Sequence, residues 1–285
     1  MTAHPVMTRQ QAQEYLRHVG MQDDCEIDLA EVALALALLD RREIAADRYR
    51  RHIAMLAAEV AALVTPARDS LACRLDAIHR VMVEQNGYQG DTASYDDPQN
   101  LNLMRVIDRR KGLPVALGIL YLQVTRLCGW NVVGLNFPGH FLIRFEYAGA
   151  RAIMDPFNAG QVRSVPDLRD LLKAAAGLDA ELMPDHYASL TNRDVLLRLQ
   201  NNLKMRLLNA NRPDRALDTI EGMLLFAPDE ALLWREAGIL QAHFHNLAQA
   251  IVALEKFLAL AHPRDPMVGP TALFVQNLKL RLRFP

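Results

Sequence analysis

The sequence predicts a predominantly helical α+β protein with one small antiparallel sheet and a C-terminal segment of helical repeats. Three observations predict this class. Long stretches rich in Ala and Leu place apolar residues at three- and four-residue steps, as amphipathic helices do. Apolar and polar residues alternate convincingly only between residues 130 and 155, and similar residues recur 34 positions apart near the C-terminus. We expect two domains, residues 1–190 and residues 191–285.

Helices fill the N-terminal part of the chain. Residues 28–63 contain no Gly or Pro and are predicted to form one helix, and residues 69–85 form another, amphipathic helix. Residues 86–100, NGYQGDTASYDDPQN, collect Gly, Asn, Asp, Ser and Pro, which indicates an irregular surface loop. Long polar loops inside compact domains are more often functional than decorative. Residues 101–112 are predicted as a short helix capped by Gly112.

A buried helix and a small sheet are predicted in the middle of the chain. The segment LPVALGILYLQVTRLCGW, residues 113–130, is apolar nearly all round and predicts a central helix. Pro114 lies in its first turn, where a missing N–H costs nothing. Period-two alternation then predicts three strands, at residues 130–137, 140–147 and 151–155.

A histidine and an aspartate are predicted to meet across the hairpin. If the turn is centred after Tyr147, His140 lies opposite Asp155. If Ala148-Gly149 are the two loop residues, His140 instead lies opposite Phe157. Because side chains repeat every two residues along a strand, both registers put His140 and Asp155 on one face. An aspartate beside an imidazole orients the ring, as in a nucleophile–base–orienter triad. Spacing alone favours the alternative, in which each residue serves only local structure.

Helical repeats are predicted at the C-terminus. From Val165 onward every segment reads as helical, and Trp234 and Gly238 form the W-x-x-x-G pattern of a tetratricopeptide repeat. The preceding unit has Gln200 and Lys204 in these positions, so it is a degenerate repeat. A final helix over residues 270–284 is predicted to cap the last apolar face. An ordinary helical bundle is the alternative. Pairs at the 34-residue spacing are Ala216 with Ala250 and Ile220 with Leu254.

Composition excludes several classes of partner. The net charge is −1 and 51% of the residues are hydrophobic, so neither a nucleic acid nor a membrane is expected as a partner. The start shows no signal peptide, and three cysteines without a CxxC pair fit a reducing compartment, so we expect a cytoplasmic protein. His243 and His245 are two residues apart on a predicted helix, so their side chains point to different faces and make a poor pair of metal ligands. No metal site and no cofactor are predicted.

Several motifs carry a family resemblance. Residues 139–158, GHFLIRFEYAGARAIMDPFN, follow a helix that starts GLPVAL and resemble the transglutaminase-like core of papain-type folds. Residues 87–122 and the motifs RRKGLP, NFPGHF and DPFN resemble the bacterial SirB-type family, which joins such a core to C-terminal tetratricopeptide repeats. The resemblance covers residues 30–264. It implies a Cys opening the central helix, a His at one strand and an Asp on the next, and His140 and Asp155 match the last two.

The third position of the implied triad departs from the family pattern. A helix N-terminus stabilises a thiolate, so a nucleophilic Cys belongs near residues 113–115, where the sequence has Leu-Pro-Val. Cys128 lies at the opposite helix end, ~20 Å away at ~1.5 Å per residue. Cys25 and Cys73 are expected to be buried small hydrophobes. The pair is therefore predicted to be the remnant of a triad, and acyl transfer through a thioester is not expected.

Four further residues are predicted to bind a ligand. Arg109 precedes the central helix, where cations and free N–H groups can hold an anion. The resemblance to the SirB-type family, whose pattern has an Arg pair before G-[IL]-P, implies a structural or a ligand-binding role for Arg109. Asn102 is a candidate helix cap as well as a ligand contact. Asn136 and Asn158 flank the strands that carry the His/Asp pair and are predicted to line the same cleft.

The function predicted from these features is that of a pseudoenzyme, a non-catalytic transglutaminase-like protein that acts as an interaction or regulatory module. The helical repeats are predicted to bind a protein or peptide partner. A hydrolase or transferase in which His140 acts as general base on water, oriented by Asp155, is the competing hypothesis. A purely structural scaffold is the third.

Overall fold

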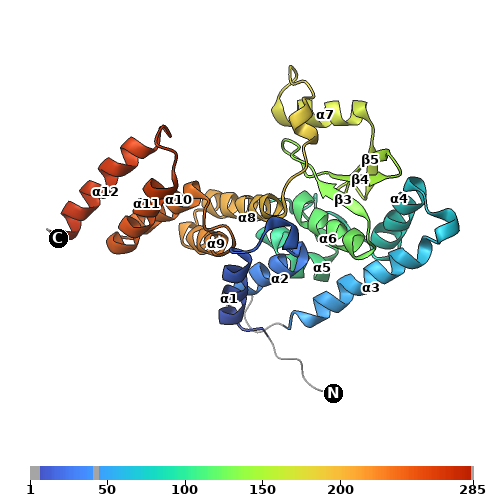
Figure 1. Cartoon of the computed structure of the whole chain (residues 1–285), viewed down its shortest axis with the longest axis horizontal. Helices are drawn as coiled ribbons and strands as arrows, with labels where there is room; N and C mark the ends of the chain where they lie inside the picture. The colour runs from blue at the N-terminus through green and yellow to red at the C-terminus, as the bar shows by residue number, and fades with distance from the viewer. Residues whose placement is uncertain (1–6, 41–44, 284–285) are drawn as a thin grey trace. The chain divides into compact units, whose positions relative to one another are not determined.

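The computed structural model describes residues 7–40 and 45–283 (Figure 1). The chain forms two compact units. Asp23–Leu199 and the residues before Gln13 make the first unit, and Gln13–Gln22 with the residues from Gln200 onward make the second. The predicted boundary after residue 190 stays a prediction.

The N-terminal helices differ from the single long helix predicted over residues 28–63, and that prediction is wrong. Helix α2 (Leu29–Asp40) ends before α3 (Asp47–Leu63) begins, and residues 41–44 lie outside the described residues. The two helices bury their residues differently. Almost all of α2 is buried, whereas α3 buries one face that includes Tyr49 and Ile53. Both segments are rich in Ala and Leu, so composition did not distinguish a helix that is buried almost throughout from one that is buried on a single face. Before them lie α1 (Arg9–Val19) and a short 3₁₀ turn (Asp24–Glu26).

The segment around the polar loop contains two strands that the sequence did not predict. Strand β1 (Gln89–Gly90) pairs in parallel with β2 (Lys111–Gly112). The predicted cap at Gly112 is wrong, because Gly112 lies in β2 and Arg110 adopts the left-handed conformation, with φ 59°, that ends the preceding helix. The remaining elements here are α4 (Leu71–His79), which continues as a π-helical turn (Arg80–Gln85), a 3₁₀ turn (Pro98–Leu101) and α5 (Leu103–Arg109).

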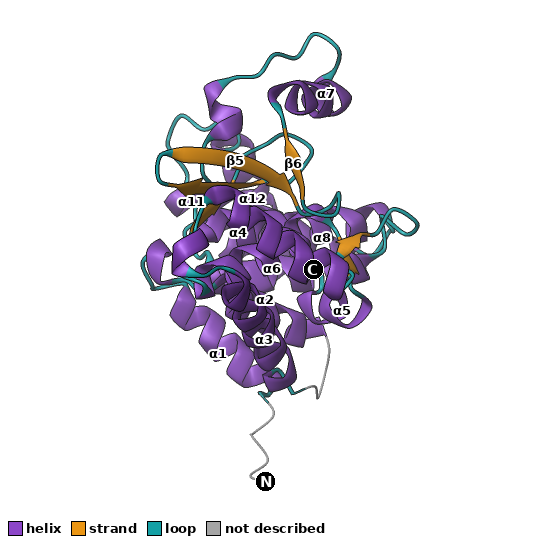
Figure 2. Ribbon diagram, turned by 90° about the vertical axis from the view of Figure 1, so that its right-hand side faces the viewer, coloured by secondary structure: helices purple, strands orange, loops and turns teal. Residues whose placement is uncertain are grey.

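The predicted central helix is present as α6 (Pro114–Leu127), and its residues are buried as far as Thr125. The sheet that follows has the antiparallel order β3 (Asn131–Gly134), β4 (Ile143–Tyr147), β5 (Ala150–Asp155), β6 (Gln161–Arg163) (Figures 1 and 2). Strand β6 was not predicted. Tyr147 pairs with Ala150, so Ala148-Gly149 form the hairpin loop of the second predicted register, with φ values of 50° and 82°. Such positive values suit the right-handed twist of a hairpin.

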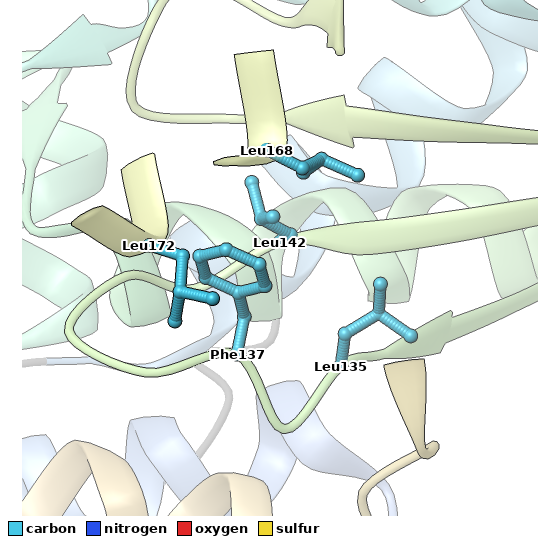
Figure 3. Packing of buried hydrophobic residues seen from close by; sticks show 5 residues of the cluster. All are labelled: Leu135, Phe137, Leu142, Leu168 and Leu172. Atoms are coloured by element: carbon cyan, nitrogen blue, oxygen red, sulfur yellow. The ribbon is translucent and has the colours of Figure 1, made fainter. Parts of the chain in front are cut away.

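Helix α7 (Val165–Ala176) packs against the segment that leads from β3 to β4. Figure 3 shows this cluster, in which Phe137 and Leu142 face two leucines of the helix. Both residues are at most 1% exposed, so they anchor the two ends of the turn that contains His140. The cluster consists of Leu135, Phe137, Leu142, Leu168 and Leu172.

The second unit consists of paired helices. Helix α8 (Asn192–Asn209) contributes to both units, and α9, α10, α11 and α12 follow it (Pro213–Phe226, Ala231–His243, Leu247–Leu260 and Val268–Arg283). Gly238 in α10 lies against α11, since a Cβ there would stand 2.5 Å from Leu254 Cγ. The predominantly helical α+β class is confirmed.

Candidate functional site

The carboxylate of Asp155 is the centre of the site. It stands at the end of β5 with 0% exposure and accepts six hydrogen bonds. Oδ1 accepts from His140 Nε2 at 2.8 Å and from the backbone N–H groups of Phe157 and Asn158 at 3.1 and 3.2 Å. Oδ2 accepts from Asn158 Nδ2 at 2.8 Å and from Arg163 Nε and Nη2 at 3.1 and 2.8 Å. The predicted contact between His140 and Asp155 therefore exists.

These donors keep Asp155 ionised. Burial by itself would raise the pKa of Asp155, but His140, Asn158 and Arg163 outweigh it and lower the pKa to about 2. Because an ionised carboxylate only accepts hydrogen bonds, Nε2 of His140 carries the proton. A neutral ring then presents the lone pair of Nδ1, to which no described residue donates a hydrogen bond.

His140 lies in a turn and not at the start of a strand, which corrects the prediction of a strand over residues 140–147. Strand β4 begins at Ile143. Gly139 has φ 67°, and Arg198 Nη2 donates to the carbonyls of Phe137 and His140 at 2.7 and 2.5 Å. These carbonyls are thus unavailable for sheet pairing. Arg198 positions the turn, and the turn positions the imidazole.

Contacts through Phe157 link the pair to the segment before α6. Its ring meets the imidazole of His140 edge-on at 5.9 Å between centroids. Its carbonyl accepts from the N–H of Gly90 at 2.9 Å, and a Cβ on Gly90 would stand 2.5 Å from the Phe157 ring. Gly90 lies in β1, which pairs with the strand that leads into α6 at Pro114. The site is therefore connected through Phe157 and the β1–β2 pair to the segment that leads into α6.

The three residues at the start of α6 are not nucleophiles. Leu113, Pro114 and Val115 are all buried and apolar. The N–H of Leu113 donates to the carbonyl of Asn100 at 3.0 Å, and Pro114 has no N–H. The start of α6 consequently supplies neither a thiol nor those two backbone donors.

The cysteines lie in other places. Cys128 follows the C-terminal end of α6, where its Sγ donates to the carbonyl of Ala57 at 3.4 Å and burial raises the pKa of its thiol. Cys73 is partly buried in α4. The expectation that Cys25 is buried is wrong, because it is exposed in a short 3₁₀ turn that buries none of its residues.

Arg109 organises the polar loop. Its Nη1 donates to Asn100 Oδ1 at 2.8 Å and its Nη2 pairs with Asp91. Burial would raise the pKa of Asp91, which is 2% exposed, but hydrogen bonds from Ser94 and Arg109 lower this pKa to about 2. Within the described part of the chain, Arg109 makes no hydrogen bond to His140 or Asp155.

The predicted asparagines separate into different environments. Asn158 binds Asp155 directly. Asn102 caps α5 by accepting from the N–H of Arg105 at 3.2 Å, and its Nδ2 donates to the carbonyl of Ala37 at 3.3 Å. Asn136 is exposed, and its N–H donates to the carbonyl of Ala188 at 2.9 Å. Of these asparagines, only Asn158 contacts the His/Asp pair. A ligand-binding role for Asn102, Asn136, Asn158 and Arg109 stays a prediction.

Two arginines at the site were missed from the sequence. Arg163 lies in β6, a three-residue strand that is too short to show a period-two pattern. Arg198 lies in α8, which the sequence pattern assigned to the repeats. A weak signal existed for Arg163, because a buried carboxylate usually has a cationic partner.

Neither a metal centre nor a membrane span is found in residues 7–40 and 45–283. No group of three or more His, Cys, Asp or Glu side chains there could hold a metal ion. No helix in these ranges is both long and apolar enough to cross a bilayer.

We expect the stability of the protein to fall in strong acid because of Asp155. Its folded pKa of about 2 lies below the ordinary value of 3.8, so it stabilises the folded state fully above about pH 4, and this contribution is lost as the pH falls toward 2. The loss is about 2 kcal/mol, at about 1.4 kcal/mol for each pKa unit. Urea unfolding at a series of pH values between 4 and 2 measures it.

Asp155→Asn is the matched control, since it removes this titration and should flatten the decline. An equal pH dependence in both proteins would contradict the prediction. His52, whose pKa burial and Arg110 lower to about 4, titrates at the upper edge of this window, but it does so in both proteins and cancels in the comparison. Asp91 contributes to the decline in both proteins.

Comparisons with known proteins agree with this architecture. Residues 47–201 match the transglutaminase-like superfamily, and residues 203–276 match a tetratricopeptide repeat. A UPF0162 protein of Vibrio cholerae is 32% identical over 246 residues, covering 86% of this chain and 90% of that protein. One from Xylella fastidiosa is 30% identical over 193 residues, covering 66% and 68%. The mouse F-box only protein 21 is 37% identical over 84 residues, 30% of this chain and 13% of that protein.

These matches cover both parts that the motifs predicted. The superfamily match spans the buried helix, the sheet and the His/Asp pair, and the repeat match begins inside α8. The chain therefore belongs to the SirB-type family of bacterial proteins, in which a transglutaminase-like domain is followed by tetratricopeptide repeats.

Proposed function

We propose that this protein is a non-catalytic member of the transglutaminase-like superfamily that works as a protein-interaction module. The observation that carries the proposal is the start of α6, where the family resemblance places the nucleophile and where the side chains of Leu113, Pro114 and Val115 cannot attack a substrate. Tetratricopeptide repeats generally mediate contacts between proteins, which supports the interaction role. The three unpaired cysteines support the proposed cytoplasmic location.

The hydrogen bonds of Asp155 also support a structural role for the pair. Arg163 forms two bonds to Oδ2, so its charge already compensates much of the carboxylate. If Asp155 served only to stabilise a charged imidazole, Arg163 would not help it, because a second cation weakens the attraction between the carboxylate and the imidazole. In the proposed role, Asp155 joins β6, the turn at His140 and the turn that follows β5.

His140→Ala tests the proposal. We expect the variant to unfold about 1–3 kcal/mol more easily, because a buried hydrogen bond to Asp155 is lost, and to retain full partner binding. Urea unfolding measures the first effect, and co-purification of partners with the full-length protein measures the second. Turnover of an amide or ester by the wild type that disappears in a folded His140→Ala protein would contradict the non-catalytic role.

One observation favours a hydrolase as the second candidate. Nδ1 of His140 receives no hydrogen bond from any described residue, and 14% of the side chain is exposed. A neutral imidazole oriented through Nε2 in this way is able to take a proton from a bound water. This candidate predicts turnover that falls in both His140→Gln and Asp155→Asn, whereas labelling of thiols by electrophiles stays at the level of an ordinary cysteine.

A further inference from the structure

The first helices of successive repeats carry a row of exposed apolar side chains. Met205, Ile239 and Leu273 lie 34 residues apart on α8, α10 and α12. Their exposed fractions are 51%, 39% and 60%. Because the three residues occupy equivalent positions in successive repeats, their exposure is a regular feature of the repeats and differs from the isolated exposure of single apolar residues.

Contacts between the three helices make the row continuous. Lys204 Nζ on α8 pairs with Glu236 on α10 at 2.6 Å. Arg235 Nε on α10 donates to Thr271 Oγ1 on α12 at 3.1 Å. The contacting residues precede the apolar row by at most four positions, so the three helices stand side by side at the level of that row.

A second row runs one helical turn further along the same helices. Asn209, His243 and Asn277 are again 34 residues apart, and all three are exposed. None of the three side chains has a hydrogen-bond partner among the described residues. Amide and imidazole groups can both donate and accept, so this row matches the N–H and C=O groups of a peptide backbone. We call the two rows together the first-helix face.

Charge is distributed unequally between first and second helices. On residues 200–209, α10 and α12 the only acidic residue is Glu236, which is paired with Lys204. By contrast, α9 carries an excess of acid. Lys204 is buried and paired with Glu236, and Lys279 pairs with Glu255 of α11 at 2.6 Å. The other cations on these three segments are Arg206, Arg235, Arg281 and Arg283.

We infer that the first-helix face binds an amphipathic partner segment that carries apolar side chains flanked by Asp or Glu. This inference rests on the proposed interaction function and names the chemistry of the partner. Apolar side chains of the segment cover the row at Ile239, its backbone bonds to the polar row, and its carboxylates meet the arginines of α10 and α12, which are Arg235, Arg281 and Arg283. A lipid surface offers no backbone amides for the polar row.

A pair of synthetic peptides tests the chemistry. One alternates Leu with Glu, so that its extended chain has Leu on one side, Glu on the other and free backbone N–H and C=O groups, and its partner has Lys in place of every Glu. Fluorescence anisotropy with the full-length protein is expected to show saturable binding of the Glu peptide, weakened by added salt, and no binding of the Lys peptide. Equal or tighter binding of the Lys peptide would overturn the inference, as would no binding of either.

Two surface variants test the location. Ile239→Glu places a like charge on the apolar row and should weaken binding of the Glu peptide by at least about tenfold. Val252→Glu is the matched control, because Val252 is a 64% exposed apolar residue on the second helix α11. Circular dichroism checks that both variants are folded. Equal weakening by the two variants would overturn the assignment to the first-helix face.

Other occupants of this face give different results. Self-association in analytical ultracentrifugation that Ile239→Glu abolishes would show that a second copy of the chain covers the face, and would overturn the inference. Binding of phosphatidylserine vesicles in place of the Glu peptide would do the same. A natural partner that Ile239→Glu releases but the Glu peptide does not displace would leave the proposed function standing and reject the acidic class. Absence of any captured partner would reject the function itself.

Discussion

Asp155→Ala is expected to lower the free energy of unfolding by about 3–5 kcal/mol, because it removes the fully buried member of a charge network. The substitution leaves the mostly buried side chains of Arg163 and His140 without their acceptor. It also leaves the N–H groups of Phe157 and Asn158 unpaired. Urea unfolding followed by circular dichroism at neutral pH measures the loss.

A surface aspartate provides the control for this experiment. Asp218 lies on α9 with 57% of its side chain exposed and only a 3.9 Å approach from Arg215. Asp218→Ala should change the free energy of unfolding by no more than about 0.5 kcal/mol. If Asp155→Ala were equally mild, the carboxylate would not be the connector of the surrounding turns, and the structural role proposed for the pair would be wrong.

The meeting of His140 and Asp155 was predictable from the sequence only in part. The even-numbered hairpin loop sets the register of β4 and β5 and hence the face that Asp155 takes, whereas His140 precedes β4 and owes its final position to the turn that Arg198 holds. The helix α6 was predictable from its composition, since a long run of mostly apolar residues specifies burial on every side, and α6 is buried from Pro114 to Thr125. Patterns among residues close in sequence predict such features correctly, because contacts with distant residues do not alter them.

The remaining parts of the site depend on distant residues. Arg198 reaches the carbonyl of His140 from 58 positions away, and nothing within the turn indicates it. Strands β1 and β2 are two residues each, and they pair because the chain returns after a loop and a helix. The break between α2 and α3 was missed because both flanking segments favour helix, so composition did not reveal that their buried faces differ. Long-range contacts decide each of these features.

The packing of Phe141 shows how the core supports the site without taking part in it. Phe141 follows His140 directly and is 1% exposed. Its ring lies over Gly118 of α6, where a Cβ would overlap the ring, and a Cβ on Gly134 of β3 would stand 2.7 Å from its Cζ. Arg198 covers the ring from α8 with its guanidinium carbon 5.5 Å from the centroid. The two glycines therefore provide the space that the ring fills.

Phe141→Ala is accordingly expected to cost about 3–5 kcal/mol in the free energy of unfolding, since it empties a fully packed aromatic site. Gly118→Leu should also destabilise, because the new side chain would collide with the ring. Combined in one protein, the added leucine enters the space that the ring vacates, so the double variant should lose less than the sum of the two. A double-mutant cycle by urea unfolding measures this coupling, expected at about 1–3 kcal/mol. Additive losses would mean that the ring does not occupy the space above Gly118, and that the turn carrying His140 is held by Arg198 and the α7 cluster alone.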